Sequence, residues 1–318
     1  MYENPYQRKL EPGIEFLILM GIWIACFVIG SVVTIPIWIA MTGKSLFTMQ
    51  KDMFDVANIN AVKVIQVVST IIIFLIPAVV TARIASQQAF QRLGFKSGIK
   101  IERVVVAALV MFCSLPLVGA LAELNKAIPI SAAWKKIFDG MESQYAEQVK
   151  LMATFKTPVD YIVALFIIAL MPAIVEEVFF RGAMQNIFMR WFKIPWLVIF
   201  ITGLIFSAIH FSWYGFIPRL ALGMILGYIF YFTGNLWYSI AAHFFNNALM
   251  VTILYFQYMK DKKIDMEVGE SAPWWAGLIS AVVVVALFVL LKRISATKVY
   301  PDSIAAGSTE TEQNNFLS

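Results

Sequence analysis

Long apolar runs separated by short polar loops make up most of this 318-residue chain. A helix needs about 20 apolar residues to cross a hydrocarbon core roughly 30 Å thick. The pattern therefore predicts an all-α polytopic membrane protein, a bundle of about eight transmembrane helices of which the sixth is the shortest. The predicted spans are residues 14–41, 62–82, 104–122, 159–180, 195–212, 219–233, 237–257 and 274–291.

Composition agrees with this membrane assignment. Hydrophobic residues make up 60% of the chain, charged residues only 14%, and the mean hydropathy is +0.76, which lies outside the usual balance of a soluble domain. The first run is too long for the core of a signal peptide, so we expect a retained helix. Cys26 and Cys113 lie in apolar runs without metal-ligand spacing and are expected to be buried small residues.

Lysine and arginine gather on one side of the predicted bundle. The positive-inside rule places this side, and with an even number of spans both termini, in the cytoplasm of a cell-membrane protein. The net charge of +5 is spread along the loops, which favours contact with the lipid bilayer and gives no case for nucleic acid. The basic positions are Arg8, Lys9, Arg83, Arg92, Lys96, Lys100, Arg103, Lys292, Arg293 and Lys298.

The chain is expected to fold as one bundle with several parts. Residues 131–156 combine aromatic and charged residues at helical spacing, which predicts an amphipathic segment on the outer interface, with packing favoured over a role as a lid. Gly223 and Gly227 form a GxxxG pattern that we expect to serve packing within the chain. The predicted parts are a cytoplasmic segment (1–13), N-terminal helices with the outer loop (14–157), a catalytic core (158–257), an outer loop with the last helix (258–292) and a disordered cytoplasmic tail (293–318).

Ionisable residues inside the apolar runs are the candidates for function. The only two histidines, His210 and His243, both lie in such runs, and the adjacent carboxylates Glu176 and Glu177 follow another. Glu177 and Arg181 are four residues apart on a helix, acid before base, which favours an ion pair. Glu176 is rotated by about 100°, so it is left to face a cavity, where it could act as a general base.

The histidine segments add hydrogen-bonding groups to these acids. His243 and Asn247 share one helical face, with Asn246 alongside, and can direct two donors to a single point, as an oxyanion requires. His210 follows Phe206 by four residues and could pair with a carboxylate to orient a water molecule. One histidine alone is more often a satisfied core residue, but two histidines together with the acid pair favour a catalytic site.

Three segments in order resemble the motifs of a known family. They look like the CAAX-protease and bacteriocin-processing family, also called the Abi family, which includes the eukaryotic prenyl-protein endopeptidase. The resemblance covers roughly residues 160–255 and leaves the rest of the chain without a hint of substrate. The matching motifs are Glu176-Glu177-xxx-Arg181, Phe206-xxx-His210 and His243-xxx-Asn247.

The resemblance implies an intramembrane endopeptidase that uses no serine, cysteine, metal or other cofactor. By position, Glu176 with help from His210 would activate the attacking water, and His243 with Asn247 would stabilise the oxyanion. The substrate would be a peptide or membrane-anchored protein, whether CAAX-like or bacteriocin-related. The resemblance gives supporting roles to Glu177, Arg181 and Phe206.

Three other function classes stay open at this point. Glu176, His210 and His243 could supply three zinc ligands with one open position, although the chain lacks HExxH. Members of the family are also associated with bacteriocin immunity and partner binding, so the motifs could serve binding without turnover. A transporter should show broken helices or internal repeats, and the sequence indicates neither.

The depths of the two histidines pose a geometric problem. His210 lies late in the fifth predicted span and His243 early in the seventh, although both spans run in the same direction. A shared site therefore requires a tilted fifth helix or a short sixth span that shifts its neighbours.

Overall fold

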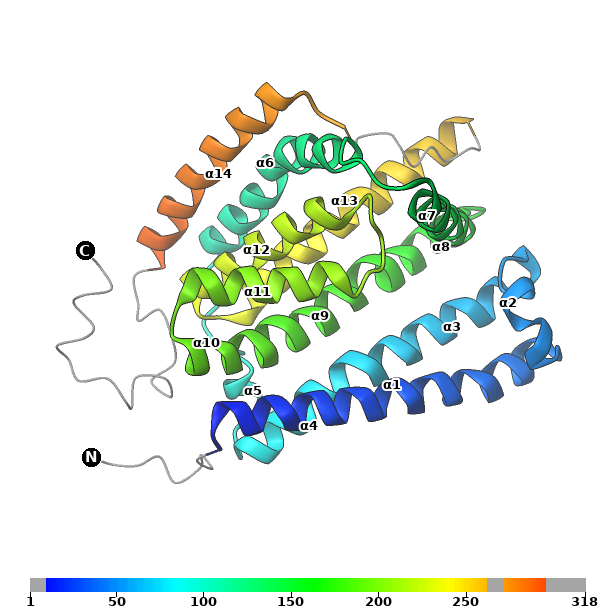
Figure 1. Cartoon of the computed structure of the whole chain (residues 1–318), viewed down its shortest axis with the longest axis horizontal. Helices are drawn as coiled ribbons and strands as arrows, with labels where there is room; N and C mark the ends of the chain where they lie inside the picture. Colours follow the sequence, from blue (N-terminus) through cyan, green and yellow to red (C-terminus); the bar gives the residue numbers. More distant parts are fainter. Residues whose placement is uncertain (1–9, 262–270, 296–318) are drawn as a thin grey trace.

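The computed structural model describes residues 10–261 and 271–295. Every regular element in these two ranges is helical, which confirms the all-α prediction (Figure 1). The first nine residues and the predicted disordered tail from 296 onward lie outside the described residues. The elements are α1 (Pro12–Thr42), η1 (Leu46–Thr48), α2 (Met49–Asp52), η2 (Val56–Asn58), α3 (Ile59–Thr70), η3 (Ile71–Leu75), α4 (Ile76–Ala85), α5 (Ala89–Arg92), α6 (Ile101–Lys126), α7 (Ala132–Met152), α8 (Pro158–Ala164), η4 (Leu165–Leu170), α9 (Met171–Glu177), η5 (Val178–Gln185), α10 (Asn186–Phe192), α11 (Pro195–Ala208), α12 (Phe216–Thr233), α13 (Leu236–Asp261) and α14 (Trp274–Ile294).

Seven of the eight predicted spans are helices long and apolar enough to cross a membrane, counted over the described residues. The chain is therefore a multi-pass membrane protein. The prediction that the sixth span is the shortest was wrong, because α12 has 18 residues whereas α11, the fifth, has 14. At 1.5 Å per residue α11 is only about 21 Å long. Apolar residues continue with Ile209 and Phe211, but the helix has already ended at Ala208, and Phe211 adopts a left-handed φ of 50°.

The helices form three groups across the bundle (Figure 1). Helix α1 packs along α3 and α4 as an antiparallel hairpin on one side, and α6 pairs with α14 on the other. The long helix from Pro158 to Phe192, with α11, α12 and α13, lies between these two groups. All the motif residues belong to this central group, so both flanking pairs shield them.

Local signals start the central helices where the sequence places them. Proline occupies the first turn of α8 and α11, where its missing N–H costs nothing. A capping box between Thr157 and Asp160 adds reciprocal hydrogen bonds at the start of α8. The long central helix therefore begins at a fixed residue, which sets the depth of the acids that follow.

Three π-helical segments widen the membrane helices. Proline follows the first two closely, with Pro77 after η3 and Pro172 after η4. Proline lacks an N–H and its ring crowds the carbonyl four residues earlier, so the preceding turn opens. The third, η5, starts directly after Glu177, and π turns of this kind occur often at functional sites.

The predicted amphipathic segment is helix α7. It contacts the loop that joins α11 to α12, on the side of the bundle shown at the right of Figure 1. The rings of Phe138 and Trp213 stack with centroids 5.2 Å apart, and Ser212 donates a hydrogen bond of 2.9 Å to Glu142. Helix α7 therefore holds the loop that directly follows His210.

Candidate active site

Glu177 and Arg181 form a buried ion pair at the centre of the bundle. The side chains of both residues are fully buried, and Arg181 Nη1 donates to Glu177 Oε1 over 2.7 Å. The guanidinium also lies 4.8 Å from the centroid of the Phe206 ring and donates to the carbonyl of Gly223 over 2.9 Å. The predicted pairing is confirmed, although the intervening turn is π-helical. The arginine is thus a fixed counter-charge inside the protein.

His243 lies between the two glutamates. Its Nδ1 is 3.0 Å from Glu177 Oε1, the same oxygen that Arg181 binds, and its Nε2 is 3.9 Å from Glu176 Oε2. The first distance is a hydrogen bond, and the second is too long for one but short enough for both groups to contact a single water molecule. Sequence reasoning assigned Glu177 only to Arg181, because helical spacing shows neighbours on one helix and not contacts between helices.

His210 lies in the turn after α11 and is exposed. Its Nδ1 is 2.7 Å from the carbonyl oxygen of Phe206. A carbonyl only accepts hydrogen bonds, so Nδ1 carries the proton and a neutral ring keeps its Nε2 lone pair as an acceptor. Glu176 and His243 both act electrostatically on this ring.

Phe206 joins the two imidazoles. Its ring centroid is 4.9 Å from that of His210 and 6.2 Å from that of His243. Helix α11 ends at Ala208, and the turn that follows it places the His210 ring against Phe206, whose ring also lies near that of His243. The two histidines therefore reach one site through the early end of α11.

Asn247 lies one turn beyond His243 on α13. Its Oδ1 accepts a hydrogen bond from Asn246 Nδ2 over 3.3 Å, which leaves its own amide N–H groups as donors. The described residues show no direct polar contact from Asn247 to Glu176, His210 or His243. The structure thus brings together the two glutamates, the arginine, the phenylalanine and both histidines, and places Asn247 at the edge of this group.

The positions of Glu176, His210 and His243 bear on the three-ligand metal site that the sequence left open. Among the described ranges, no group of three or more His, Cys, Asp or Glu side chains is arranged to hold a metal ion. Glu176, His210 and His243 are neighbours without converging on one point in that way.

Helix α12 runs beside the central helix in a constant register. Arg181 donates to the carbonyl of Gly223, and Gln185 donates to that of Gly227 over 3.1 Å, so both pairs are separated by 42 residues. A Cβ on Gly223 would lie 3.0 Å from the Cα of Gly203. The two glycines of the GxxxG pattern therefore bring α12 against α11 and expose their carbonyls to the buried donors. Gln185, fully buried, is a contributor that the sequence did not single out.

Comparison with known families gives this geometry a context. Residues 158–249 match the family model described as Type II CAAX prenyl endopeptidase Rce1-like. This part of the chain is similar to the Rce1-like family. The matched segment contains all seven predicted site residues, from Glu176 to Asn247, and agrees with the family resemblance of the motifs.

A curated relative also matches part of the chain. It is the uncharacterized protein YpbD of Bacillus subtilis (strain 168), which is 31% identical over 105 residues. The match covers 32% of this chain and 51% of the relative, so the chain spans about half the length of the curated protein it matches. No solved structure matches the chain.

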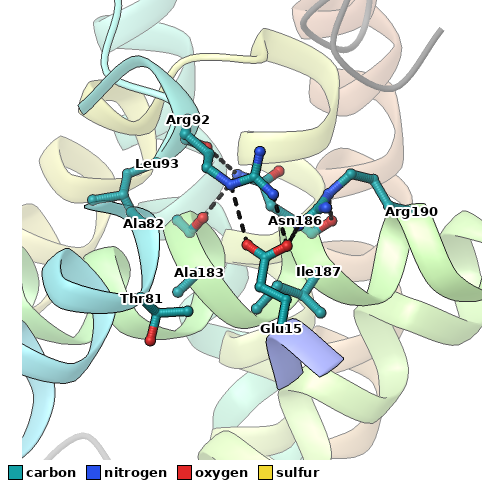
Figure 2. Close-up of a pocket in the computed structure, with 10 residues that line it drawn as sticks. Glu15, Thr81, Ala82, Arg92, Leu93, Ala183, Asn186, Ile187 and Arg190 are labelled. Carbon is teal, nitrogen blue, oxygen red and sulfur yellow. Dashed lines mark hydrogen bonds and ion pairs between the residues drawn. The ribbon is translucent and has the colours of Figure 1, made fainter. Parts of the chain in front are cut away.

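A second buried charge cluster lies at the end of the bundle near α5, and the sequence analysis missed its acid. Glu15 is 2% exposed and accepts hydrogen bonds from Arg92 Nε at 3.1 Å and Arg92 Nη2 at 2.6 Å. Arg190 Nη2 binds the same carboxylate over 2.6 Å (Figure 2). The cluster ties α1 to α5 and α10. The sequence signal that could have identified Glu15 is a single acid within an apolar run.

Proposed function

We propose that this protein is an intramembrane endopeptidase that hydrolyses a peptide bond with a water molecule activated by Glu176. The observation that carries the proposal is the His243 ring between two carboxylates, within a segment that matches an endopeptidase family model. Such a group of acid and imidazole side chains, partly exposed on one side, provides the components of general acid–base catalysis.

The attack step follows from the positions of the donors and acceptors. Glu176 makes no hydrogen bond within the described residues, and its side chain is 14% exposed, so its carboxylate is available to take a proton from water. The Nε2 lone pair of His210 would orient the same water. The water oxygen then bonds to the peptide carbonyl carbon, whose oxygen becomes an oxyanion.

The second half of the reaction needs donors for that oxyanion. The amide of Asn247 and Nε2 of His243 would supply them. Because Nδ1–H of His243 donates to Glu177, donation from Nε2 requires a second proton on the ring. Collapse of the intermediate breaks the carbon–nitrogen bond, and the proton held by Glu176 passes to the leaving amine. No covalent bond to the protein forms at any step.

The substrate class follows from the family and the location of the site. We propose a peptide or a membrane-anchored protein, since the acids lie inside the helix bundle and the flanking helices are apolar. A CAAX-like tail and a bacteriocin-related peptide both belong to this class.

The deciding experiment is cleavage of a fluorogenic peptide library by the full-length protein in detergent. Glu176→Gln should lower the rate by about 10²–10⁴-fold, while its melting temperature stays close to that of the wild type. Glu102→Gln changes an exposed acid in the first turn of α6 and should leave cleavage unchanged. A zinc chelator in a parallel assay should have no effect.

Three results would contradict the proposal. Equal cleavage by Glu176→Gln and wild type would exclude Glu176 as the base. Loss of cleavage in the chelator would favour a metal-dependent protease. A well-folded wild-type protein that cleaves no member of the library would favour a binding role for the motifs.

A further inference from the structure

A second arginine lies beside the proposed catalytic group. Arg219 is on α12 one turn before Gly223. The 42-residue offset that pairs Arg181 with Gly223 and Gln185 with Gly227 places Arg219 at the level of Glu177. The register of the two helices therefore brings this arginine to the height of the two glutamates.

The guanidinium of Arg219 folds over the loop that follows His210. A Cβ on Gly215 would clash with Nη1 of Arg219 and would lie 2.6 Å from its Cζ and 2.7 Å from its Nη2, so the absence of a side chain at Gly215 makes room for the guanidinium. The positive charge acts on the His210 ring, as does the negative charge of Glu176. Arg219 thus belongs to the electrostatic surroundings of the proposed water-activating pair.

Arg219, which is partly buried, differs from Arg92, Arg181 and Arg190 in having no acidic partner. Arg92 and Arg190 bind Glu15, and Arg181 binds Glu177. Within the described part of the chain the Arg219 guanidinium makes no hydrogen bond or ion pair, and Nη1 is closed off from solvent without a partner. A partly buried guanidinium without a counter-charge is costly and is a candidate for a functional role.

We propose that Arg219 binds a carboxylate of the peptide substrate, next to the bond that is cleaved. The inference rests on the proposed peptidase function. A carboxylate accepts two parallel hydrogen bonds from a guanidinium, which fixes both position and orientation. A peptide can offer this group either at its C-terminus or on an aspartate or glutamate side chain.

The test measures binding, so that it does not depend on turnover. Pools of short peptides are prepared with a C-terminal acid, with a C-terminal amide, and with an amide plus one fixed glutamate. Each pool is passed over the immobilised Glu176→Gln protein, and retained peptides are quantified by mass spectrometry. One of the two carboxylate pools should bind about 10- to 100-fold more tightly than the amide pool, and which one does so identifies the carboxylate.

Variants at two positions make the test specific. Arg219→Gln in the same background should abolish the preference for carboxylate, and Arg219→Lys should retain part of it because charge remains without the fork. Gly215→Ala should weaken the preference, since the new Cβ displaces the flexible end of the arginine. Arg83→Gln removes an exposed arginine at the end of α4 and should change nothing.

The outcomes separate this inference from the proposed function. Equal retention of all three pools, or a preference that survives Arg219→Gln, would overturn carboxylate binding even if the wild type cleaves peptides. A uniform loss of binding across the pools in Arg219→Gln would indicate a structural role and overturn it as well. An Arg219-dependent preference in a wild type that cleaves nothing would support carboxylate binding and contradict the peptidase.

Discussion

Glu15 and Glu177 are both buried glutamates held by arginine, yet their surroundings differ in one respect. Both oxygens of Glu15 accept hydrogen bonds, from Arg92 and Arg190. At Glu177 a single oxygen accepts both bonds, from Arg181 and His243, and Oε2 has no partner. In the first cluster both carboxylate oxygens are hydrogen-bonded and join three helices. In the second cluster one carboxylate oxygen has no hydrogen-bond partner.

The atoms left over in the two regions also differ in kind. Near Glu15 they are the buried Oγ1 of Thr81 and Oδ1 of Asn186, which line a cavity of ≈ 20 Å³ (Figure 2), room enough for a water molecule. In the central group they include atoms of charged side chains, Glu177 Oε2, Arg181 Nε and Arg219 Nη1, beside the neutral Oε1 of Gln185. Buried charges without partners are concentrated where a protein does chemistry or binding. The comparison therefore distinguishes a structural cluster from the proposed functional one.

Neutralising Glu177 should have the largest effect on stability. Glu177→Gln leaves the fully buried Arg181 without a counter-charge, which should cost about 3–5 kcal/mol of unfolding free energy. Unfolding in mixed detergent and denaturing surfactant would measure this loss, with the exposed Glu102→Gln as the matched control. A loss no greater than that of the control would mean that Arg181 does not need its carboxylate.

The same change at Glu15 should cost less. Arg92 and Arg190 are 12% and 16% exposed, so after Glu15→Gln they can recover some hydration, and we expect a loss of about 1–3 kcal/mol. The folded variant should keep most of its peptide cleavage, in contrast to Glu176→Gln. Cleavage rate per folded molecule is the measurement, and loss of cleavage with intact folding would place Glu15 in the functional cluster.

A larger side chain at the contact between α11 and α12 should lower both the stability of the protein and its rate of cleavage. A Cβ at Gly223 would meet Gly203 Cα at 3.0 Å and Phe206 Cδ1 at 3.2 Å, so Gly223→Ala should cost about 1–2 kcal/mol by overpacking and should slow cleavage by shifting Phe206. The control is Gly21→Ala, an exposed position on α1 with no neighbour within 4 Å of the new Cβ. Unchanged stability and cleavage in Gly223→Ala would show that the helices can separate at no cost.

The elements of this fold were predictable because their signals are local. Apolar runs of membrane length predicted the spans, and helical spacing predicted both helix α7 and the pairing of Glu177 with Arg181. The end of α11 was not predictable, since Ile209 and Phe211 continue the apolar pattern while the backbone turns. The π segments were also missed, although Pro77 and Pro172 stand next to two of them.

The other features that the sequence did not predict are contacts between helices. The hydrogen bond from His243 to Glu177 joins residues 66 positions apart, and the register that carries Arg219 to the height of the glutamates depends on α12 packing against the central helix. Neither follows from spacing along a single helix. Glu15 could have been found by the rule that singled out Glu176, because it too is an acid in an apolar run.

The smallest predicted effect concerns the helix that holds the loop after His210. Hydrogen bonds from Lys135 and then Tyr214 lower the pKa of Asp139 below its usual range. A lowered pKa means that the ionised form stabilises the contact above the ordinary carboxyl pKa of about 3.9, and that this stabilisation is lost as pH falls through the lowered value.

Hydrogen exchange of α7, corrected for intrinsic rates, should therefore be constant from neutral pH down to about pH 4 and increase below it. Asp139→Asn should raise exchange slightly at neutral pH and remove this acid-dependent step. The Lys135 side chain, which is exposed on the same helix and bonded to Asp139 over 2.7 Å, provides a matched variant, since Lys135→Met should move the step toward higher pH without removing it. If the step persists in Asp139→Asn, another acid on α7 causes it, and Asp139 does not stabilise the contact between α7 and this loop.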